Sequence, residues 1–466
     1  MKKNKYTISI FVLIVCISLF MVCLHHIEPD YFWHITAGKY MMQNGLLTKD
    51  VFSWSIPGKY WMSHEWLFEF MIAGMRWIFG KYHILLYTFF SIFGCLGVLF
   101  FTNIKGVLKN IPYTLVTLLF YILLGVVFVQ TRPHLLQFFL FTIMMYLLYD
   151  QYQNKDSKKI YFLPVLTIVW ANVHGGSSNL PYLFCFLFLI GGLFSFSFSK
   201  IEAKRLSKKQ LQRYFIVMIL CMISTCINLH GWKLFLYPYQ NILDSRMIQN
   251  IAEWKSTSLQ EPYHIVYYLY LVFVVLTFRL SRKKIRGMDF LLFGVTAYLG
   301  LRSIRFWMYV YITMSFVLLD YVKIRKEDRF SIPSLFLLSF AFLLFFAFSF
   351  PKITTIPSYY ALNEKVISLL KEKNPKRLYH MYDYGGELIY HNQKVFIDGR
   401  ADLYGKYNYQ DYLDISYGRN MESLIQKYDF DYYLVSSKYP IAMYLKDHDY
   451  TLIYEKDDIL LYEKSS

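Results

Sequence analysis

A segment close to the amino terminus carries several side chains that can act as acids, bases or ligands. Asp30 precedes His34 by four residues, and His64 is followed directly by Glu65. A carboxylate next to aromatic residues can serve as a general base, because loss of water and nearby cations set its pKa. Asp30 can equally cap a helix that begins near Tyr31, since Asp is a preferred capping residue. Both roles of Asp30 stay open at this point.

Further polar side chains occur at the ends of apolar runs. If these runs cross a membrane, those ends reach the same side of it. Guanidinium groups among them can recognise phosphate through paired hydrogen bonds, whether that phosphate belongs to a substrate or to a lipid headgroup. Convergence of such groups from several segments favours a polar cavity, because isolated charges are costly within a bilayer. We therefore expect the following residues to bind substrate: His34, His64, Glu65, Arg132, His174, His230, Arg302 and Arg305.

A metal site is an alternative use of the same side chains. Imidazole and carboxylate groups suit zinc or manganese. The possible ligands are His34, His64, Glu65 and His174. They come from separate segments and lack a compact ligand spacing. We therefore expect no cofactor and keep a divalent metal as the alternative.

The composition indicates that the side chains discussed above belong to a membrane protein. Of the 466 residues, 56% are hydrophobic, 20% aromatic and only 17% charged. The net charge of +17 could indicate a nucleic-acid partner, but the excess lies in the apolar first 350 residues, which hold 34 basic and 15 acidic side chains. A nucleic-acid domain would be basic without being apolar. We expect a lipid bilayer as the environment and no nucleic acid as a partner.

Apolar runs close to the ~20 residues needed to cross a bilayer recur along this part of the chain. We expect eleven spans, at 7–24, 83–102, 112–130, 135–149, 160–173, 181–199, 214–230, 263–280, 288–301, 304–320 and 332–350. With the amino terminus in the cytoplasm, 23 of the 34 basic residues fall in cytoplasmic segments, as the positive-inside rule requires. An odd number of spans then places the carboxy-terminal region outside.

The chain is expected to form two domains that meet at Pro351. Residues 1–350 would be the transmembrane domain, with the first outer loop at 25–82, and 351–466 a small extracytoplasmic α/β domain. Strands are expected at 377–381, 394–397, 432–436, 450–454 and 459–462, and helices at 362–372, 386–391, 409–417 and 421–428. Asp383 and Asp398 follow strands, where α/β sheets tend to hold ligands. Both also stand in turns with glycine, and Asp398 could instead pair with Arg400.

These features together resemble a known family. A retained first span, an Asp just outside it, a long first outer loop, about eleven spans and an outward carboxy-terminal domain resemble the GT-C superfamily of polyprenyl-phosphate-dependent glycosyltransferases. A bacterial subgroup assigned to this class is similar in four motifs. They are Asp30-x-x-Trp33-His34, His64-Glu65-Trp66-Leu67, Trp170-x-Asn172-x-His174-Gly175 and Val395-Phe396-Ile397-Asp398-Gly399-Arg400.

The resemblance implies an activity and a location. A sugar would pass from a polyprenyl-phosphate-linked donor to a glycan, lipid or protein acceptor, with inversion at the sugar carbon, on the outer face of the bacterial cytoplasmic membrane. Asp30 matches the acidic residue of the superfamily's first outer loop and would act as the base. In related aminoarabinose and protein-mannosyl transferases this Asp is followed by Glu, whereas here Tyr31 follows.

Other functions are compatible with the same composition. A transporter or flippase of an envelope lipid or glycan would tend to carry polar residues at mid-membrane and in paired repeats. In this sequence the polar groups gather at one side and no repeat is evident. A polysaccharide polymerase or ligase of another fold is a further possibility, as is an inactive scaffold whose outer domain binds a partner.

Overall fold

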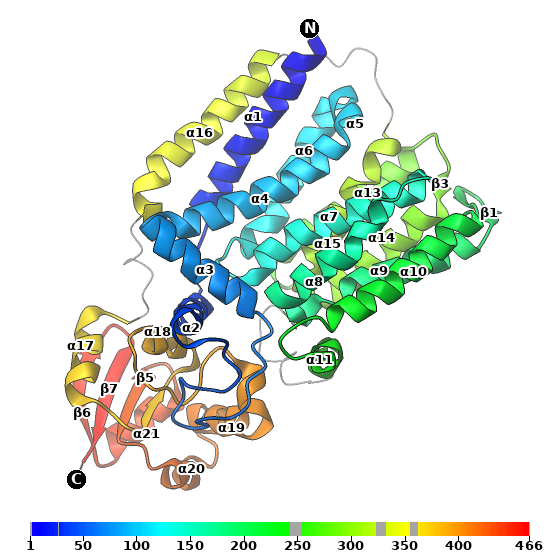
Figure 1. Ribbon diagram of the computed structural model, residues 1–466. Helices are drawn as coiled ribbons and strands as arrows, with labels where there is room; N and C mark the ends of the chain where they lie inside the picture. The colour runs from blue at the N-terminus through cyan, green and yellow to red at the C-terminus, as the bar shows by residue number, and fades with distance from the viewer. Residues whose placement is uncertain (1, 27, 243–253, 323–331, 355–361, 466) are drawn as a thin grey trace. The chain divides into compact units, whose positions relative to one another are not determined.

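The computed structural model describes residues 2–26, 28–242, 254–322, 332–354 and 362–465 (Figure 1). The chain divides into two compact units. The helical unit comprises Met1–His26 and Ile84–Thr354, and the α/β unit comprises Ile27–His83 and Thr355–Ser466. The first outer segment therefore belongs to the same unit as the carboxy-terminal region. This grouping differs from the expected one, which placed that segment with the helices.

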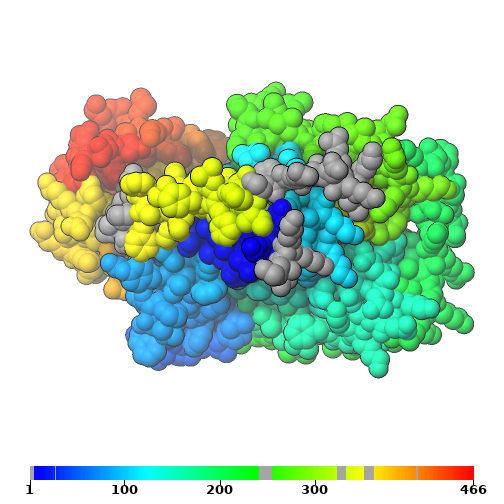
Figure 2. All heavy atoms as spheres, turned by 90° about the horizontal axis from the view of Figure 1, so that it is seen from above, coloured from blue at the N-terminus to red at the C-terminus, as the bar shows by residue number. Residues whose placement is uncertain are grey.

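The helical unit is built from α-helices and one small sheet. The helices are α1 (Lys2–Cys23), α4 (His83–Thr102), α5 (Ile104–Lys109), α6 (Ile111–Gly125), α7 (Pro133–Gln153), α8 (Leu163–Val173), α9 (Leu180–Leu193), α10 (Lys208–Thr225), α11 (Trp232–Ile242), α13 (Ile265–Leu280), α14 (Gly287–Arg302), α15 (Trp307–Ser315) and α16 (Ile332–Thr354). The three-stranded sheet has the order β1 (Phe196–Phe198), β2 (Ile201–Ala203) and β3 (Ile285–Arg286). Helices α1 and α16 lie side by side, as the blue and yellow atoms in Figure 2 show.

Six stretches of the described chain are helical, long and apolar enough to cross a membrane. They are Lys5–Cys23, Trp66–Thr102, Ile111–Phe128, Gly175–Leu193, Pro262–Leu280 and Ile332–Phe350. Each overlaps one of the expected spans. The other five expected spans fall on α7, α8, α10, α14 and α15, which are helical but do not combine this length and apolarity. The number of eleven spans therefore stays a prediction.

In the α/β unit, two helices come from the first outer segment and the rest from the carboxy-terminal region. The helices are α2 (Asp30–Asn44), α3 (Trp66–Phe79), α17 (Glu364–Lys373), α18 (Gly385–Tyr390), α19 (Ala401–Ser416), α20 (Met421–Tyr428) and α21 (Pro440–Asp447). The strands are β4 (Leu378–His380), β5 (Tyr432–Ser436), β6 (Tyr450–Lys456) and β7 (Ile459–Lys464). They form one sheet in the order β4-β5-β7-β6, in which β4 and β5 are parallel and the other pairs antiparallel.

One expected strand of this unit was wrong, and one helix was not expected. Residues 394–397 do not extend the sheet, and Val395 forms an isolated parallel bridge with Ser53 of the first outer segment. Sequence reasoning also missed α21, which begins at Pro440. A short apolar run has the same pattern whether it joins a sheet or crosses a loop from elsewhere, and here the partner was a distant loop.

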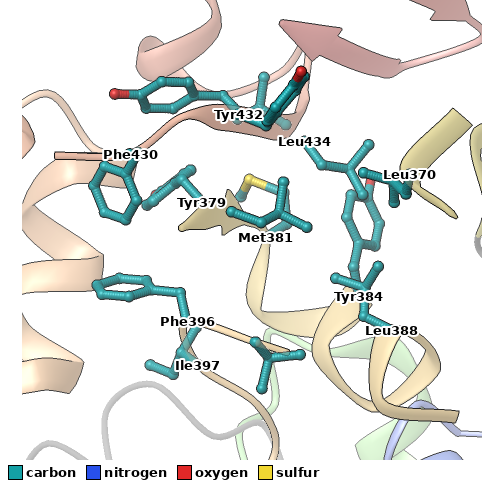
Figure 3. Close-up of a cluster of buried hydrophobic side chains, with 14 of the residues drawn as sticks. Leu370, Tyr379, Met381, Tyr384, Leu388, Phe396, Ile397, Phe430, Tyr432 and Leu434 are labelled. Carbon is teal, nitrogen blue, oxygen red and sulfur yellow. The ribbon is translucent and has the colours of Figure 1, made fainter. Parts of the chain in front are cut away.

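A shared hydrophobic core explains why the first outer segment belongs to this unit. Its side chains Trp33, Met41 and Trp61 are buried in the same cluster as residues of the sheet and of α18. Figure 3 shows the sheet side of this cluster, where Tyr379 and Met381 pack near Phe396 and Leu388. Burial of large apolar side chains is the main favourable term in folding, so these contacts hold the two segments together.

A buried ion network adds a specific link between the two segments. Arg400 is 2% exposed, and its Nη2 lies 2.6 Å from Asp398 Oδ2 while its Nη1 lies 2.8 Å from Asp50 Oδ1. Tyr404 donates its hydroxyl to Asp398 at 2.5 Å. Burial opposes ionisation of Asp398, but the Arg400 guanidinium outweighs it and holds the pKa of that carboxyl below its ordinary value. Asp398 therefore pairs with Arg400, one of the two roles that the sequence allowed.

We predict that Asp398→Ala destabilises the α/β unit strongly. The substitution leaves Arg400 buried with only Asp50 as its carboxylate partner, and removal of one member of a buried pair costs about 3–5 kcal/mol. The free energy of unfolding of the purified protein in detergent, followed by tryptophan fluorescence, measures this loss. Asp458→Ala is the control, because Asp458 pairs with Lys438 at the surface, where such pairs contribute little. Equal effects of the two substitutions would contradict the role of Arg400.

Candidate active site

Asp30 is the first residue of α2, and Pro29 occupies the capping position before it. Its side chain is 9% exposed, and Trp33 Nε1 donates a hydrogen bond to its Oδ1 at 3.0 Å. A carboxylate at this end of a helix is stabilised by the backbone N–H groups and the helix dipole. Asp30 is thus a nearly buried carboxylate whose orientation is fixed by an indole of its own helix.

Two glycines of the carboxy-terminal region approach the start of α2 closely, one at the Asp30 carboxylate and one at the Pro29 backbone. A Cβ atom added at Gly399 would lie 1.7 Å from Asp30 Oδ1 and 2.9 Å from Trp33 Nε1. One added at Gly386 would lie 2.3 Å from the carbonyl oxygen of Pro29. Only residues without a side chain allow these approaches. The glycines of the motifs at 383–387 and 395–400 therefore shape the surroundings of Asp30.

Next to Asp30, carboxylates and imidazoles alternate along a row that we term the acid–imidazole chain: Glu69, His34, Glu65, His64 and Asp402. His34 is 1% exposed; its Nδ1 lies 3.7 Å from Glu69 Oε1 and its Nε2 lies 3.6 Å from Glu65 Oε2. Farther along, His64 Nε2 lies 3.5 Å from Glu65 Oε1 and His64 Nδ1 lies 4.0 Å from Asp402 Oδ2. The chain leads from the fully buried Glu69 to the partly exposed Asp402.

A close helix crossing sets the buried end of this chain. A Cβ added at Gly38 of α2 would lie 2.0 Å from the carbonyl oxygen of Glu69 on α3. Gly38 stands one turn after His34, so the two helices meet just where the imidazole must reach Glu69. Ser63 donates its hydroxyl to Glu69 Oε2 at 3.0 Å and fixes the other carboxylate oxygen. Trp33 lies over His34, with 3.6 Å between the ring centroids, and so joins Asp30 to the chain.

Neighbouring charges change the acidity of two groups here. Burial alone would lower the pKa of His64, but the carboxylates of Glu65 and Asp402 raise it to about 9. Desolvation and the nearby carboxylate of Asp30 raise the pKa of Asp383. Like charges close together oppose ionisation, so Asp383 senses Asp30 as a near neighbour. His64 is therefore cationic at neutral pH, on the exposed side of the chain.

The structure divides the expected site residues between the two units. Asp30, His34, His64 and Glu65 come together in the α/β unit as described above. In the helical unit, Arg305 Nη2 donates to His174 Nε2 at 3.2 Å, and His174 Nδ1 contacts Gln137 Oε1. The Arg305 guanidinium also lies 5.3 Å from the centre of the Trp254 ring. Arg305 and His174 therefore form a second polar cluster.

The remaining expected residues lie at helix ends of the helical unit. Arg132 precedes the first residue of α7 and is half-buried. His230 is buried just before α11, and its backbone N–H donates to Asn228 Oδ1 at 2.6 Å. Arg302 is the last residue of α14 and is exposed. Sequence reasoning missed Glu69 and Gln137; the spacing of Glu69 four residues after Glu65, on one helical face, was the available signal.

A metal centre is the alternative use of His34, His64, Glu65 and His174. Among the residues that the structure describes, no group of three His, Cys, Asp or Glu side chains is arranged to hold a metal ion. His174 belongs to the helical unit, whereas His34, His64 and Glu65 belong to the α/β unit. The metal alternative therefore stays a prediction.

A solved structure of another protein aligns with most of this chain, whereas the sequence of the chain finds no match. No family model matches its sequence, and no curated protein matches it. The crystal structure of the Archaeoglobus fulgidus oligosaccharyltransferase in the apo form aligns with 93% of this chain and 70% of that chain, at 11% identity and a TM-score of 0.42. A likeness at this level carries no argument about fold or activity. Function must be argued from the side chains.

We predict that Gly399→Ala destabilises the protein by about 1–3 kcal/mol, the range for overpacking a tight interior. The added methyl group must displace Asp30, the Trp33 indole or the 395–400 backbone. Gly74→Ala is the matched control, because a Cβ at Gly74 of α3 meets nothing within 4 Å and helix propensity favours alanine. Unfolding in detergent measures both. Equal stability of the two variants would show that the backbone does not approach Asp30 closely.

The raised pKa of His64 predicts a dependence of stability on pH. Because the folded-state pKa of about 9 exceeds the ordinary value of 6.5, the stabilisation from protonated His64 is complete below about pH 6.5 and is lost as pH rises through 9. The loss reaches at most about 1.4 kcal/mol per pH unit. The difference in unfolding free energy between the wild type and His64→Gln should shrink from pH 6.5 to pH 9. A difference that does not change with pH contradicts the ion pairs of His64.

Proposed function

We propose that this chain is a membrane glycosyltransferase that moves a glycosyl group from a lipid-phosphate-linked donor to an acceptor on the outer face of the bacterial cytoplasmic membrane. The observation that carries the proposal is the Asp30 carboxylate, nearly buried, oriented by Trp33 and closely approached by Gly399. The sequence resemblance to the GT-C superfamily and the helices able to cross a membrane support it.

In the proposed reaction, Asp30 acts as the general base. Its carboxylate takes the proton of an acceptor hydroxyl or amine, and the freed lone pair forms a bond to the anomeric carbon of the donor sugar. The bond from that carbon to the phosphate oxygen breaks, and its electron pair leaves with the lipid phosphate. Attack opposite to the leaving group inverts the sugar carbon. A positioned base contributes ~10²–10⁴-fold to such a step.

The leaving phosphate requires cationic partners in this scheme. Among the expected arginines of the helical unit, Arg305 has a guanidinium that is already oriented by hydrogen bonding to His174 and by the face of Trp254. Arginine donors that are already oriented stabilise developing charge without reorganisation. Arg132 and Arg302 are further candidates, and His230 completes the expected set of substrate-binding residues. The proposed step needs no cofactor.

The acid–imidazole chain would bind the substrate beside Asp30 and orient it. His34, Glu65 and His64 offer both donors and acceptors of hydrogen bonds within one short row. Such mixed donors and acceptors suit the hydroxyl groups of a sugar or of a glycan acceptor. The acceptor class of the proposal is a glycan, lipid or protein that carries a hydroxyl or amine.

We predict that Asp30→Asn abolishes transfer while the fold persists. The amide keeps the shape of the side chain, and its oxygen can still accept from Trp33, but it cannot take a proton. Transfer should fall by ~10²–10⁴-fold. Mass analysis of envelope lipids and glycans from cells with the wild type, the variant or no protein measures the product.

Asp458→Asn is the control for that experiment, because Asp458 is a surface carboxylate paired with Lys438. It should leave the product unchanged. Thermal unfolding of purified Asp30→Asn should match the wild type. A full amount of sugar product with Asp30→Asn at normal protein levels would remove Asp30 from the chemistry.

A further inference from the structure

Two cations of the α/β unit share one tyrosine ring outside the acid–imidazole chain. Lys39 Nζ of α2 lies 5.0 Å from the centre of the Tyr390 ring, and Arg76 Cζ of α3 lies 5.9 Å from the same point. Arg76 Nη2 also donates to the Tyr390 hydroxyl at 3.0 Å. One aromatic side chain at the end of α18 thus holds an ammonium and a guanidinium group close together.

Carboxylates do not neutralise this pair. Within the described ranges, the ion pairs of the protein include neither Lys39 nor Arg76. Burial and the charge of Arg76 lower the pKa of Lys39, as expected for like charges held close together. Two uncompensated cations at fixed positions attract an anion with more than one oxygen. The arginine fork and the lysine point charge both suit phosphate.

An exposed apolar surface adjoins the two cations. Trp77, Ile78 and Phe79 follow Arg76 directly on α3 and are 80%, 63% and 46% exposed. They lie in the apolar stretch Trp66–Thr102, one of the candidate membrane spans. Exposed aromatic and aliphatic side chains beside basic groups are typical of a helix at the membrane interface. Such a surface selects a phosphate that is attached to acyl chains.

We propose that Lys39 and Arg76 bind the phosphate of an anionic membrane phospholipid, with Trp77, Ile78 and Phe79 against its acyl chains. Neither Lys39, Arg76 nor Tyr390 is among the candidate catalytic and substrate-binding residues discussed above. It stands whether or not the chain transfers sugars. Tyr390 positions the two cations, and its hydroxyl sets the direction of the guanidinium.

The test is lipid binding to the purified full-length protein in a neutral detergent. Native mass spectrometry gives apparent dissociation constants for phosphatidylglycerol and for diacylglycerol, which has the same chains without the phosphate. The wild type should bind phosphatidylglycerol more tightly. Each of Lys39→Gln and Arg76→Gln should weaken that binding about fivefold, since one basic group near a lipid surface contributes about this factor. Unchanged binding in both variants overturns the site.

A matched control separates this site from general attraction to basic residues. Lys427 also lies over a tyrosine ring, with Nζ 4.9 Å from the centre of Tyr428, but it is neutralised by Asp411 at 2.7 Å. Lys427→Gln should therefore leave phosphatidylglycerol binding unchanged. A loss equal to that of Lys39→Gln would overturn the proposal, because the effect would then follow net charge.

Two further measurements test for binding of a soluble ligand and for misfolding of the variants. Inorganic phosphate should not displace phosphatidylglycerol from the wild type; full displacement would make this a site for free phosphate and overturn the assignment to a lipid. Tyr390→Phe keeps the ring under both cations and removes only the hydroxyl that holds Arg76. It should weaken binding less than Arg76→Gln does. Equal thermal unfolding of the variants confirms that each one is folded.

Discussion

The buried guanidinium of Arg400 is the constraint on which the α/β unit depends. An arginine cannot lose its charge in a protein, so a buried one must be paired with carboxylates or hydrogen-bonded to other oxygen atoms. Asp398 provides one from the same turn, and Asp50 provides the other from a segment far away in sequence. Placing Arg400 therefore fixes where the first outer segment meets the carboxy-terminal region. Phe52 and Trp61 cover the guanidinium with their rings, so the same contact is also sealed by apolar groups.

The position of the candidate base Asp30 depends on the ion network of Arg400 through a single residue, Gly399. Gly399 lies between Asp398 and Arg400, so the backbone held by the ion network is the backbone that approaches Asp30. The tripeptide thus combines a structural pair with a glycine that leaves room for a carboxylate. Fold and candidate site share neighbouring residues, and a change in the ion network moves the surroundings of Asp30.

Local properties of the chain were predictable from the sequence, whereas pairings between distant segments were not. Strands β4, β5, β6 and β7 and the long apolar helices follow from short-range patterns of side chains. The same patterns do not say which partner an apolar face will meet. Trp33 was therefore expected within a helical domain, although its side chain packs in the core of the α/β unit. Glu69 was missed for a related reason: its role appears only when Gly38 brings α2 against α3.

Clusters of charged side chains that balance one another's charge serve the structure, whereas clusters with unbalanced charge can bind a ligand. In the helical unit, Arg286 meets Asp289 at 2.6 Å and Asp320 at 2.7 Å, and two tyrosines complete its surroundings. Arg400 is compensated in the same way, by the carboxylates of Asp398 and Asp50. Lys39 and Arg76 differ, because the ion pairs among the described residues include neither of them, and they share the ring of Tyr390.

His34 is intermediate between the compensated clusters and the uncompensated pair of Lys39 and Arg76. Its ring nitrogens lie 3.6 and 3.7 Å from two carboxylates, longer than ordinary hydrogen bonds, so neither acid fixes the imidazole. The Trp33 ring lies against this ring at an angle of 33° and donates to Asp30, which couples the place of the imidazole to that of the proposed base. Under the proposed function, Asp30 must release the proton that it takes in each cycle. Two sets of titratable side chains adjoin Asp30: the row that begins beside Trp33 and ends at the partly exposed Asp402, and Asp383, whose pKa the Asp30 carboxylate raises.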